Sequence, residues 1–373
     1  MLALKHTVLA RYQHYKYKKD CTLPALRLLA GPTAYEQLEA NGLQQSLFTQ
    51  IFAASGGPKW LAIAGLDKYL FSEFFKQRQD PLYTMGASSG AWRLSCMAQQ
   101  DPIAAYERLE HFYIHQDYQK KPTREQVSAQ VLHIVDGILG EQQGADIIAN
   151  PLIRHHMVAC RARHLNRIQA KFGLMIGLSM AAVSNVVNRK SLGWHFERVI
   201  LSHKDDASPF RRLKDLPTKH VELTQDNIRH GLLASGSIPL LLDPVKDLQG
   251  SPKGHYYDGG ITDYHFDMPL PAATGLSLYP HFYPYMSPGW FDKSLLWRKA
   301  KANYHNGLIL APSKQFIASL PFSKIPDRED FKYLDTPTRI AYWQQSVQQS
   351  QILADEFAEI VASGTIMDRI ERL

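Results

Sequence analysis

The pentapeptide Gly86-Ala87-Ser88-Ser89-Gly90 follows the apolar run Pro81–Met85 and precedes the helix-forming run Ala91–Gln99. This order predicts a strand, a sharp turn and a helix, with Ser88 at the tip of the turn. A G-x-S-x-G turn holds its serine in a strained conformation, and the flanking glycines let neighbouring backbone pass without a clash. Ser88 is therefore a candidate nucleophile for acyl transfer. A glycine-containing turn between a strand and a helix is also an ordinary structural device.

Strand and helix patterns alternate around this turn. Phe48–Ala54 predicts a strand and Trp60–Phe75 a helix, and both precede the Pro81–Met85 strand. Alternation of this kind indicates an α/β fold, which we expect to be a three-layer α/β/α sandwich with a mainly parallel central sheet. Further elements are expected as strands at Leu152–Arg163, Arg198–His203, Leu276–Tyr283 and Gly307–Ala311, and as a closing helix at Arg339–Ala362.

The chain contains no linker rich in Pro, Gly or Ser that would divide it. We expect residues 1–45 to form an N-terminal extension with a short helix. Residues 46–373 are expected to form one α/β domain with helical insertions and a C-terminal helix. With 45% hydrophobic residues in 373, the chain can bury a substantial core.

Charge and cysteine usage narrow the class of protein. The net charge is +7, but no basic cluster carries a nucleic-acid motif, so we expect no nucleic-acid partner. Cys21, Cys96 and Cys160 are widely spaced, which argues against a disulfide framework or a zinc site and fits a reducing compartment. The first twenty residues show no secretory signal, so a cytoplasmic location is expected. Phe172–Val187 is shorter than the roughly 18–20 apolar residues that span a bilayer, and we expect it to be a buried helix.

A serine hydroxyl needs backbone N–H groups that stabilise the oxyanion of its tetrahedral intermediate. The candidate donor loop is Ser55-Gly56-Gly57-Pro58-Lys59, which follows a predicted strand and opens a predicted helix. Pro58 has no N–H, so the donors there would be Gly56, Gly57 or Lys59, with the Ser89 amide as the second donor. The same loop could be a plain strand–helix turn. It lacks the full Walker spacing, so nucleotide binding is not expected.

A serine nucleophile also needs a base, and two arrangements are open. In the first, a late histidine completes a Ser-His-Asp triad, and His265, His281 and His305 all lie far enough along the chain. In the second, Asp258 acts directly on the serine. Asp258 ends a short aromatic segment and is followed by Gly259 and Gly260. Partial burial of Asp258 would raise its pKa and make it a better base.

Three segments in this order resemble the patatin-like phospholipases: the loop at 55–59, the pentapeptide at 86–90, and Asp258-Gly259-Gly260. A fourth segment, Ala234-Ser235-Gly236-Ser237-Ile238-Pro239, is similar to the Ala-Ser-x-Ala-x-Pro segment of that family. The resemblance covers about Phe48–Pro269.

The resemblance implies a lipid acyl hydrolase with a Ser88–Asp258 dyad, an acyl-enzyme intermediate, no histidine, and no cofactor or metal. Gly56, Gly57 and Ser89 would form the oxyanion hole, and the supporting residues would be Gly86, Gly90, Lys59, Gly259 and Gly260. The family loop reads Asp-Gly-Gly-Gly-x-Arg-Gly, whereas this chain has Ala54, Ser55, Lys59 and Trp60 in place of Asp, the first Gly, Arg and the last Gly.

Because the loop is a variant, the substrate class stays open. The expected substrate is a lipid or another acyl ester, and the enzyme could be of the phospholipase A, lysophospholipase or esterase type. The variant loop also leaves two alternatives open. One is a non-catalytic lipid- or partner-binding protein on the same fold, and the other is a Ser-His-Asp esterase.

Two further sets of residues allow a functional or a structural interpretation. Tyr279–Lys301 is aromatic and basic and includes Trp290 and Trp297, a composition that favours peripheral membrane contact, although core packing is the commoner reason for aromatic residues. His155-His156 and His164 lack the spacing of a metal site.

Overall fold

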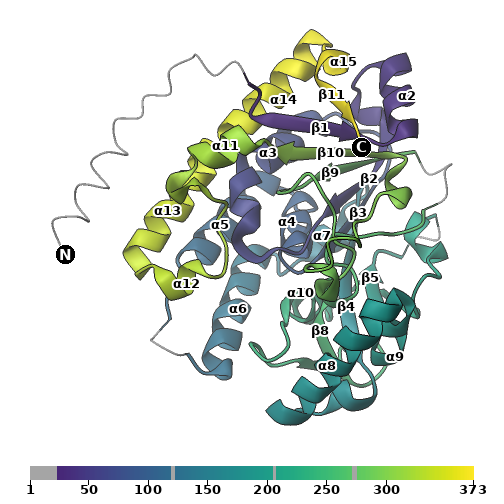
Figure 1. The fold of residues 1–373 in the computed structure, drawn as a ribbon, viewed down its shortest axis with the longest axis vertical. Coiled ribbons are helices and arrows are strands. Elements are labelled where there is room, and N and C mark those ends of the chain that lie inside the picture. Colours follow the sequence, from purple (N-terminus) through teal and green to yellow (C-terminus); the bar gives the residue numbers. More distant parts are fainter. Residues whose placement is uncertain (1–22, 119–121, 205–206, 271–274) are drawn as a thin grey trace.

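The computed structural model describes residues 23–118, 122–204, 207–270 and 275–373. Their strands form one 11-stranded sheet, in the order β11-β1-β10-β9-β2-β3-β4-β5-β6, with β8 paired to β4 and β7 paired to β8 (Figure 1). The strands are β1 Leu26–Ala30, β2 Phe48–Ala53, β3 Leu82–Ala87, β4 Ile153–Ala162, β5 Phe196–Ser202, β6 Thr218–Glu222, β7 Val245–Lys246, β8 His255–Asp258, β9 Leu276–Pro280, β10 Gly307–Pro312 and β11 Ile370–Arg372.

The helices that concern the site are α4, α8, α9 and α10. The described helices are α2 Pro32–Asn41, α3 Ala64–Tyr69, α4 Ser89–Met97, α5 Pro102–Ile114, α6 Arg124–Leu139, α7 Ala145–Ala149, α8 Lys171–Val187, α9 Leu192–His195, α10 Ile228–Gly236, α11 Lys314–Ser319, α12 Asp330–Tyr333, α13 Thr336–Gln349, α14 Gln351–Ser363 and α15 Ile366–Arg369. Two short 3-10 helices also matter, η2 at Gly57–Ile63 and η9 at Trp290–Asp292.

The centre of the sheet is parallel, as expected. Strands β10, β9, β2, β3 and β4 pair in parallel, and β3 lies between β2 and β4. The pairings of β1 with β10 and of β4 with β5 are antiparallel. The α/β prediction with a mainly parallel sheet is therefore confirmed.

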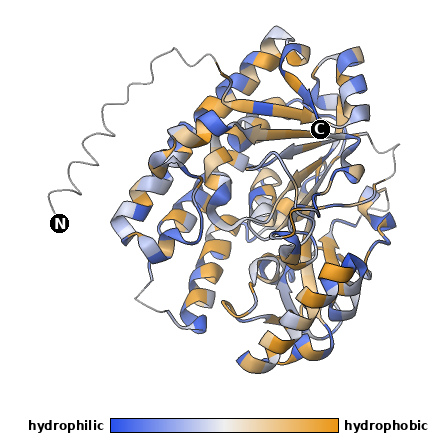
Figure 2. Cartoon of the chain, viewed as in Figure 1, coloured by the Kyte–Doolittle hydropathy of each residue, from blue (hydrophilic) through white to orange (hydrophobic). Residues whose placement is uncertain are grey.

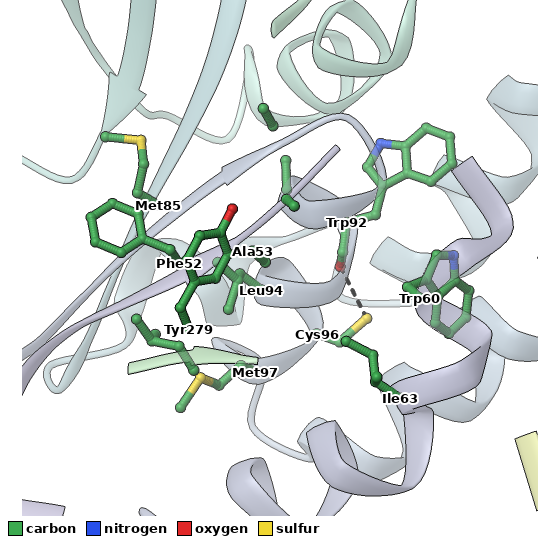
Figure 3. Packing of buried hydrophobic residues seen from close by; sticks show 14 of the residues in the cluster. Phe52, Ala53, Trp60, Ile63, Met85, Trp92, Leu94, Cys96, Met97 and Tyr279 are labelled. Carbon is green, nitrogen blue, oxygen red and sulfur yellow. Dashed lines mark hydrogen bonds between the residues drawn. The ribbon is translucent and has the colours of Figure 1, made fainter. Parts of the chain in front are cut away.

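Side chains of β4 point alternately to the two faces of the sheet, and a different helix packs on each face. Met157 lies beside Gly231 of α10, whereas Cys160 packs in one cluster with Leu174 and Leu178 of α8. Successive strand residues point to opposite faces, so α10 and α8 cover opposite faces of the sheet. Figure 3 shows buried side chains on both faces of the sheet near β2 and β3. Phe52, Met85 and Tyr279 lie on one side, and Trp60, Trp92 and Cys96 lie on the other.

The N-terminal boundary differs from the expected one. β1 lies inside the sheet between β11 and β10, so this part of the expected extension belongs to the domain. Residues 1–22 of that extension lie outside the described residues. The closing helix is also divided, because α13 ends at Gln349 and α14 begins at Gln351.

The prediction of a helix at Phe172–Val187 is confirmed by α8, but the prediction that this helix is buried is wrong. α8 is present, but Phe172, Val183 and Val187 on its outer side are 75%, 70% and 83% exposed. Leu174, Leu178 and Ala181 form its buried side. The composition is apolar all around the helix, and composition cannot tell which side the fold covers. No helix in the described ranges has both the length and the apolar character needed to cross a bilayer.

Candidate active site

Ser88 forms the turn between β3 and α4, and its backbone is strained. Its φ of 54° and ψ of −131° lie in a region that residues with a side chain rarely adopt. The flanking glycines permit this turn. A Cβ on Gly90 would lie 1.9 Å from the Ala53 carbonyl oxygen, and one on Gly86 would lie 2.5 Å from the Ala91 backbone. The expected strand–turn–helix element is present, and it presents Ser88 at the carboxyl end of the sheet.

The register of β4 brings Asp258 to Ser88. Residues 153–158 of β4 pair with β3, and residues 159–161 pair with β8. Residues 156–162 pair with β5 along the other edge, so β3 and β8 must share one edge of β4, end to end. Ala87 pairs with Val158, and Asp258 pairs with the next residue, Ala159. The two strands therefore meet where Ser88 follows β3, so Ser88 and Asp258 line one pocket, and the Ser88 hydroxyl is close enough to the carboxyl to lower the pKa of Asp258 as a hydrogen-bond donor.

Asp258 is a buried acid with a shifted pKa. Its side chain is 7% exposed, and the Gly260 amide donates to its Oδ1 at 2.7 Å. Burial raises the pKa of Asp258 above its ordinary value, against the opposing effects of the Ser88 hydrogen bond, the charge of Arg328 and the Gly260 amide. The direction agrees with the expectation from sequence. The higher pKa makes this carboxylate a stronger base for a serine hydroxyl than an exposed aspartate.

Ser235 fixes the backbone of the candidate nucleophile. The Ser88 amide donates to the Ser235 Oγ at 2.9 Å, and that hydroxyl donates to the Val158 carbonyl at 2.7 Å. Ser235 lies in α10, which is held against α4 by a hydrogen bond of 3.0 Å from the Trp92 indole to the Leu232 carbonyl. The sequence placed Ser235 in a family-like segment but gave it no role. It is a positioning residue for the strained turn.

We expect Ser235→Ala to lower the free energy of unfolding by about 1–3 kcal/mol, because it leaves the buried Ser88 amide and Val158 carbonyl without their partner. The loss should appear in chemical denaturation. If Ser88 is the nucleophile, kcat for an ester should also fall while KM changes little. A suitable control is Ser346→Ala, since that buried hydroxyl bonds the Tyr342 carbonyl of its own helix. Equal stability losses in the two variants would contradict a positioning role for Ser235.

The glycine loop supplies candidate oxyanion donors. In the described part of the chain, the amides of Gly56, Gly57 and Ser89 donate no hydrogen bond to another group. The Ser55 amide is different, because it donates to the Tyr264 carbonyl at 2.9 Å. Gly57 has a φ of +60°, which favours glycine, and a Cβ there would lie 2.9 Å from Arg328 Nε. The loop therefore keeps free N–H groups despite its departures from the family pattern.

Ser88 and Asp258 line a narrow pocket with mixed walls. The pocket is lined by Ser55, Gly56, Ser88, Ile238, Pro239, Asp258, Gly260, Ile261, Tyr264, Trp290, Lys293 and Arg328. The Ser55 Oγ is buried there without a hydrogen-bond partner among the described residues. Ile238, Pro239, Ile261 and Trp290 form an apolar side, which suits the acyl part of an ester.

Two cations of this pocket were not predicted from the sequence. Within the described residues, no carboxylate lies within ion-pair distance of Lys293 or Arg328. Although Lys293 as a whole is exposed, burial of its ammonium end and the charges of Arg328 and Lys59 lower its pKa to about 8. Lys59 is half-buried, and burial and the Arg328 charge lower its pKa as well. Positive potential therefore surrounds Asp258.

The three late histidines lie outside the lining of this pocket. His265 is buried, and its Nδ1 accepts from the Ser287 amide at 3.0 Å. His281 is also buried, and its Nδ1 accepts from the Tyr283 amide at 2.9 Å. His305 lines a different pocket, with Phe52 and Tyr304. The described geometry thus gives the Ser-His-Asp alternative no base beside Ser88.

Three further histidines, His155, His156 and His164, were expected not to form a metal site. Two of them contact side-chain hydroxyl groups. His155 Nδ1 lies 3.0 Å from the Thr84 hydroxyl, and His156 Nε2 lies 2.7 Å from the Ser208 hydroxyl. His164 is in a separate surface turn. Across the described ranges, no group of three or more His, Cys, Asp or Glu side chains is placed to hold a metal ion.

The comparisons with known proteins are sparse. No protein-family model matches the chain, and no curated protein matches it. Among solved structures, the chain is similar to VipD from Legionella pneumophila, with 12% sequence identity and a TM-score of 0.26 over 73% of this chain. The match covers 55% of VipD, so the chain spans only about half the length of that protein. A likeness this weak carries no argument about function.

Proposed function

We propose that this protein is a patatin-like serine acyl hydrolase that cleaves acyl esters with a Ser88–Asp258 dyad. The observation that carries the proposal is the position of Ser88, at a strained strand–helix turn, in one pocket with the buried Asp258 carboxyl. The raised pKa of Asp258 supports its role as the base. The unbonded amides of Gly56, Gly57 and Ser89 support the oxyanion hole.

In the first half of the reaction, Asp258 accepts the Ser88 proton as the Oγ attacks the ester carbonyl carbon. The N–H groups of Gly56, Gly57 and Ser89 stabilise the resulting oxyanion. When the tetrahedral intermediate collapses, the C–O bond to the alcohol breaks, and Asp258 returns its proton to the departing alcohol. Ser88 then carries the acyl group.

In the second half, a water molecule gives a proton to Asp258 and attacks the acyl carbon. The second tetrahedral intermediate collapses, and the Ser88 Oγ leaves and takes the proton back from Asp258. The carboxylic acid is released, and the dyad returns to its starting state. No histidine takes part.

The charge of the pocket favours one class of ester. Lys293 and Arg328 line the pocket beside the dyad, so an ester that carries a phosphate or carboxylate would be bound better than a neutral one. The narrow apolar side formed by Ile238, Pro239 and Trp290 favours the end of an acyl chain. The supported substrate class is an anionic acyl ester, such as a lysophospholipid.

We expect a fluorophosphonate probe to label the wild-type chain once, at Ser88, because the probe forms a stable adduct with an activated serine. Mass spectrometry of the intact protein and its peptides gives the site. The control is Ser95→Ala, which removes a buried hydroxyl on the same helix that bonds the Trp92 carbonyl, and it should label like the wild type. No labelling of the folded wild type would favour a non-catalytic binding protein on this fold.

A further inference from the structure

The outer side of α8 is an unpartnered apolar surface. We define the α8 face as the exposed residues Phe172, Met175, Ile176, Met180, Val183, Val186 and Val187, together with Trp194 of the adjacent α9. Trp194 is 76% exposed. α9 is tied to α8 by the contact of 3.1 Å between the Ser184 hydroxyl and His195 Nε2. In Figure 2 the α8 region, at the lower end of the view, shows this apolar composition.

The charges of the segment that carries the α8 face have one sign. Residues 163–195 contain no Asp or Glu, whereas they contain Arg163, Arg167, Lys171, Arg189 and Lys190. Arg189 lies within ion-pair distance of Asp215 and Asp292, but Arg167, Lys171 and Lys190 are exposed near the two ends of α8. An apolar face with a basic rim and a tryptophan is the pattern of a helix that lies in the interface of an anionic membrane.

A second copy of this chain fits the α8 face less well. Pairing two such faces would bring two basic rims together without any acidic residue from either segment to neutralise them. Anionic lipid headgroups supply that negative charge, and the acyl region accepts the exposed apolar side chains. Charge complementarity therefore selects a lipid surface.

The α8 face is connected to the candidate active site. Asn185 of α8 donates to Asp292 Oδ1 at 2.6 Å, and Arg298 donates to the Val186 carbonyl at 2.8 Å. Asp292 ends η9, whose first residue, Trp290, lines the Ser88 pocket. Trp290 and the pocket residue Ile261 pack in the same apolar cluster as the inner side of α8. The inner side of α8 therefore packs against the wall of the Ser88 pocket.

The aromatic segment expected to contact a membrane divides between these two regions. Trp290 is partly buried in the pocket wall, whereas Leu296 and Trp297 are 81% and 72% exposed. Arg298 ties this segment to the C-terminal end of α8. Leu296 and Trp297 can therefore extend the apolar surface beyond Val187.

We propose that α8 lies flat in the interface of an anionic phospholipid bilayer, with the α8 face inserted among the headgroups. Docking in this way brings the wall of the Ser88 pocket, which packs on the inner side of α8, close to the lipid surface. The docking itself does not depend on hydrolysis, but its role in delivering a membrane-borne ester rests on the proposed function.

The test is co-sedimentation of the full chain with vesicles of phosphatidylcholine, alone or with phosphatidylglycerol. We expect binding to the mixed vesicles and much weaker binding to phosphatidylcholine alone. Phe172→Ser/Val183→Ser should lower the partition coefficient by at least about tenfold, because two exposed apolar side chains no longer insert. The matched control is Leu23→Ser/Tyr333→Ser, which changes two exposed apolar residues elsewhere and should bind like the wild type.

Absence of wild-type binding, or equal binding by the α8 double variant, would overturn the proposal. So would a wild-type dimer in light scattering that the same double variant converts to a monomer, because the α8 face would then be covered by a second copy. Failure of the proposed function has a different signature: vesicle binding persists, but Ser88 takes no fluorophosphonate label. The double variant should hydrolyse a water-soluble short-chain ester at the wild-type rate.

Discussion

Replacing Asp258 by Asn is expected to lower kcat/KM for ester hydrolysis by about 10²–10⁴-fold, the usual contribution of a positioned general base. In the wild type, the Gly260 amide donates to Asp258 Oδ1 at 2.7 Å. The side-chain oxygen of the new asparagine can still accept this hydrogen bond, but the asparagine cannot take a proton from Ser88. In the wild type, the acid limb of the pH–rate profile should lie above pH 3.8, since burial raises the pKa of Asp258 above that ordinary value. Steady-state kinetics from pH 4 to 9 checks both points.

The same substitution should not lower stability at neutral pH. Because the folded-state pKa of Asp258 is raised, the folded protein favours the protonated acid. That favourable contribution is complete below about pH 3.8 and is lost as the pH rises through the folded-state pKa. At pH 7 the wild type folds around a buried carboxylate, and the neutral amide removes this cost. We therefore expect Asp258→Asn to unfold at the same temperature as the wild type or higher.

A neighbouring aspartate provides the contrast. Asp263 is also buried, but Arg198 donates to both of its carboxyl oxygens, at 2.7 and 2.8 Å. Asp263→Asn leaves the buried Arg198 guanidinium with Asp215 as its remaining carboxylate partner, so it should lower the melting temperature and leave the turnover of each folded molecule near the wild-type value. If Asp258→Asn behaved like Asp263→Asn, the dyad assignment would be wrong and Asp258 would be structural.

The turn that carries Ser88 could be predicted from the sequence because residues next to it in the chain determine its conformation. Gly86 and Gly90 are needed because neighbouring backbone lies so close to each that a Cβ would clash with it. The sequence shows this requirement as two glycines, each two residues from Ser88. The strand before Ser88 and the helix after it have their own apolar patterns. The strained turn at Ser88 was therefore predictable from fewer than twenty residues.

The contact between Ser88 and Asp258 has no local signal. It depends on β4 being long enough to pair with β3 and then with β8 along one edge. From the residues alone, Asp258 was one of the two open choices of base for Ser88, and the family resemblance then favoured it. Arg328 and Lys293 were missed for a related reason, because each is a single cation in a loop or short turn that no motif marks, and only the tertiary fold brings them to the pocket.

The error at α8 shows a second limit. An apolar run predicts that a segment avoids water, but the partner that covers it can be the core, another molecule or a lipid surface. Here the core covers only the stripe with Leu174, Leu178 and Ala181. The charge pattern of residues 163–195 was the available sequence signal for the other side, since a run of basic residues without acids is unusual beside a buried helix.

Replacing Ser88 tests the chemistry and the strain together. Both Ser88→Ala and Ser88→Gly remove the Oγ, so each should lower ester turnover by on the order of 10⁴–10⁶-fold and abolish labelling by the fluorophosphonate. The two variants differ in one respect. Alanine keeps a Cβ at a φ of 54° and ψ of −131°, whereas glycine adopts this conformation without a steric cost.

Ser88→Gly should therefore be more stable than Ser88→Ala by about 1 kcal/mol, after the extra freedom of glycine in the unfolded chain is subtracted from the relieved strain. Urea denaturation of the two inactive proteins measures this difference without interference from turnover. Equal stabilities would mean that the turn is not strained in solution, and Ser88 would then lose the conformational evidence for its role. If Ser88→Gly is clearly more stable than Ser88→Ala, the fold keeps a side chain at position 88 at a cost in stability. Chemistry at the Ser88 hydroxyl gives a physical reason for that cost.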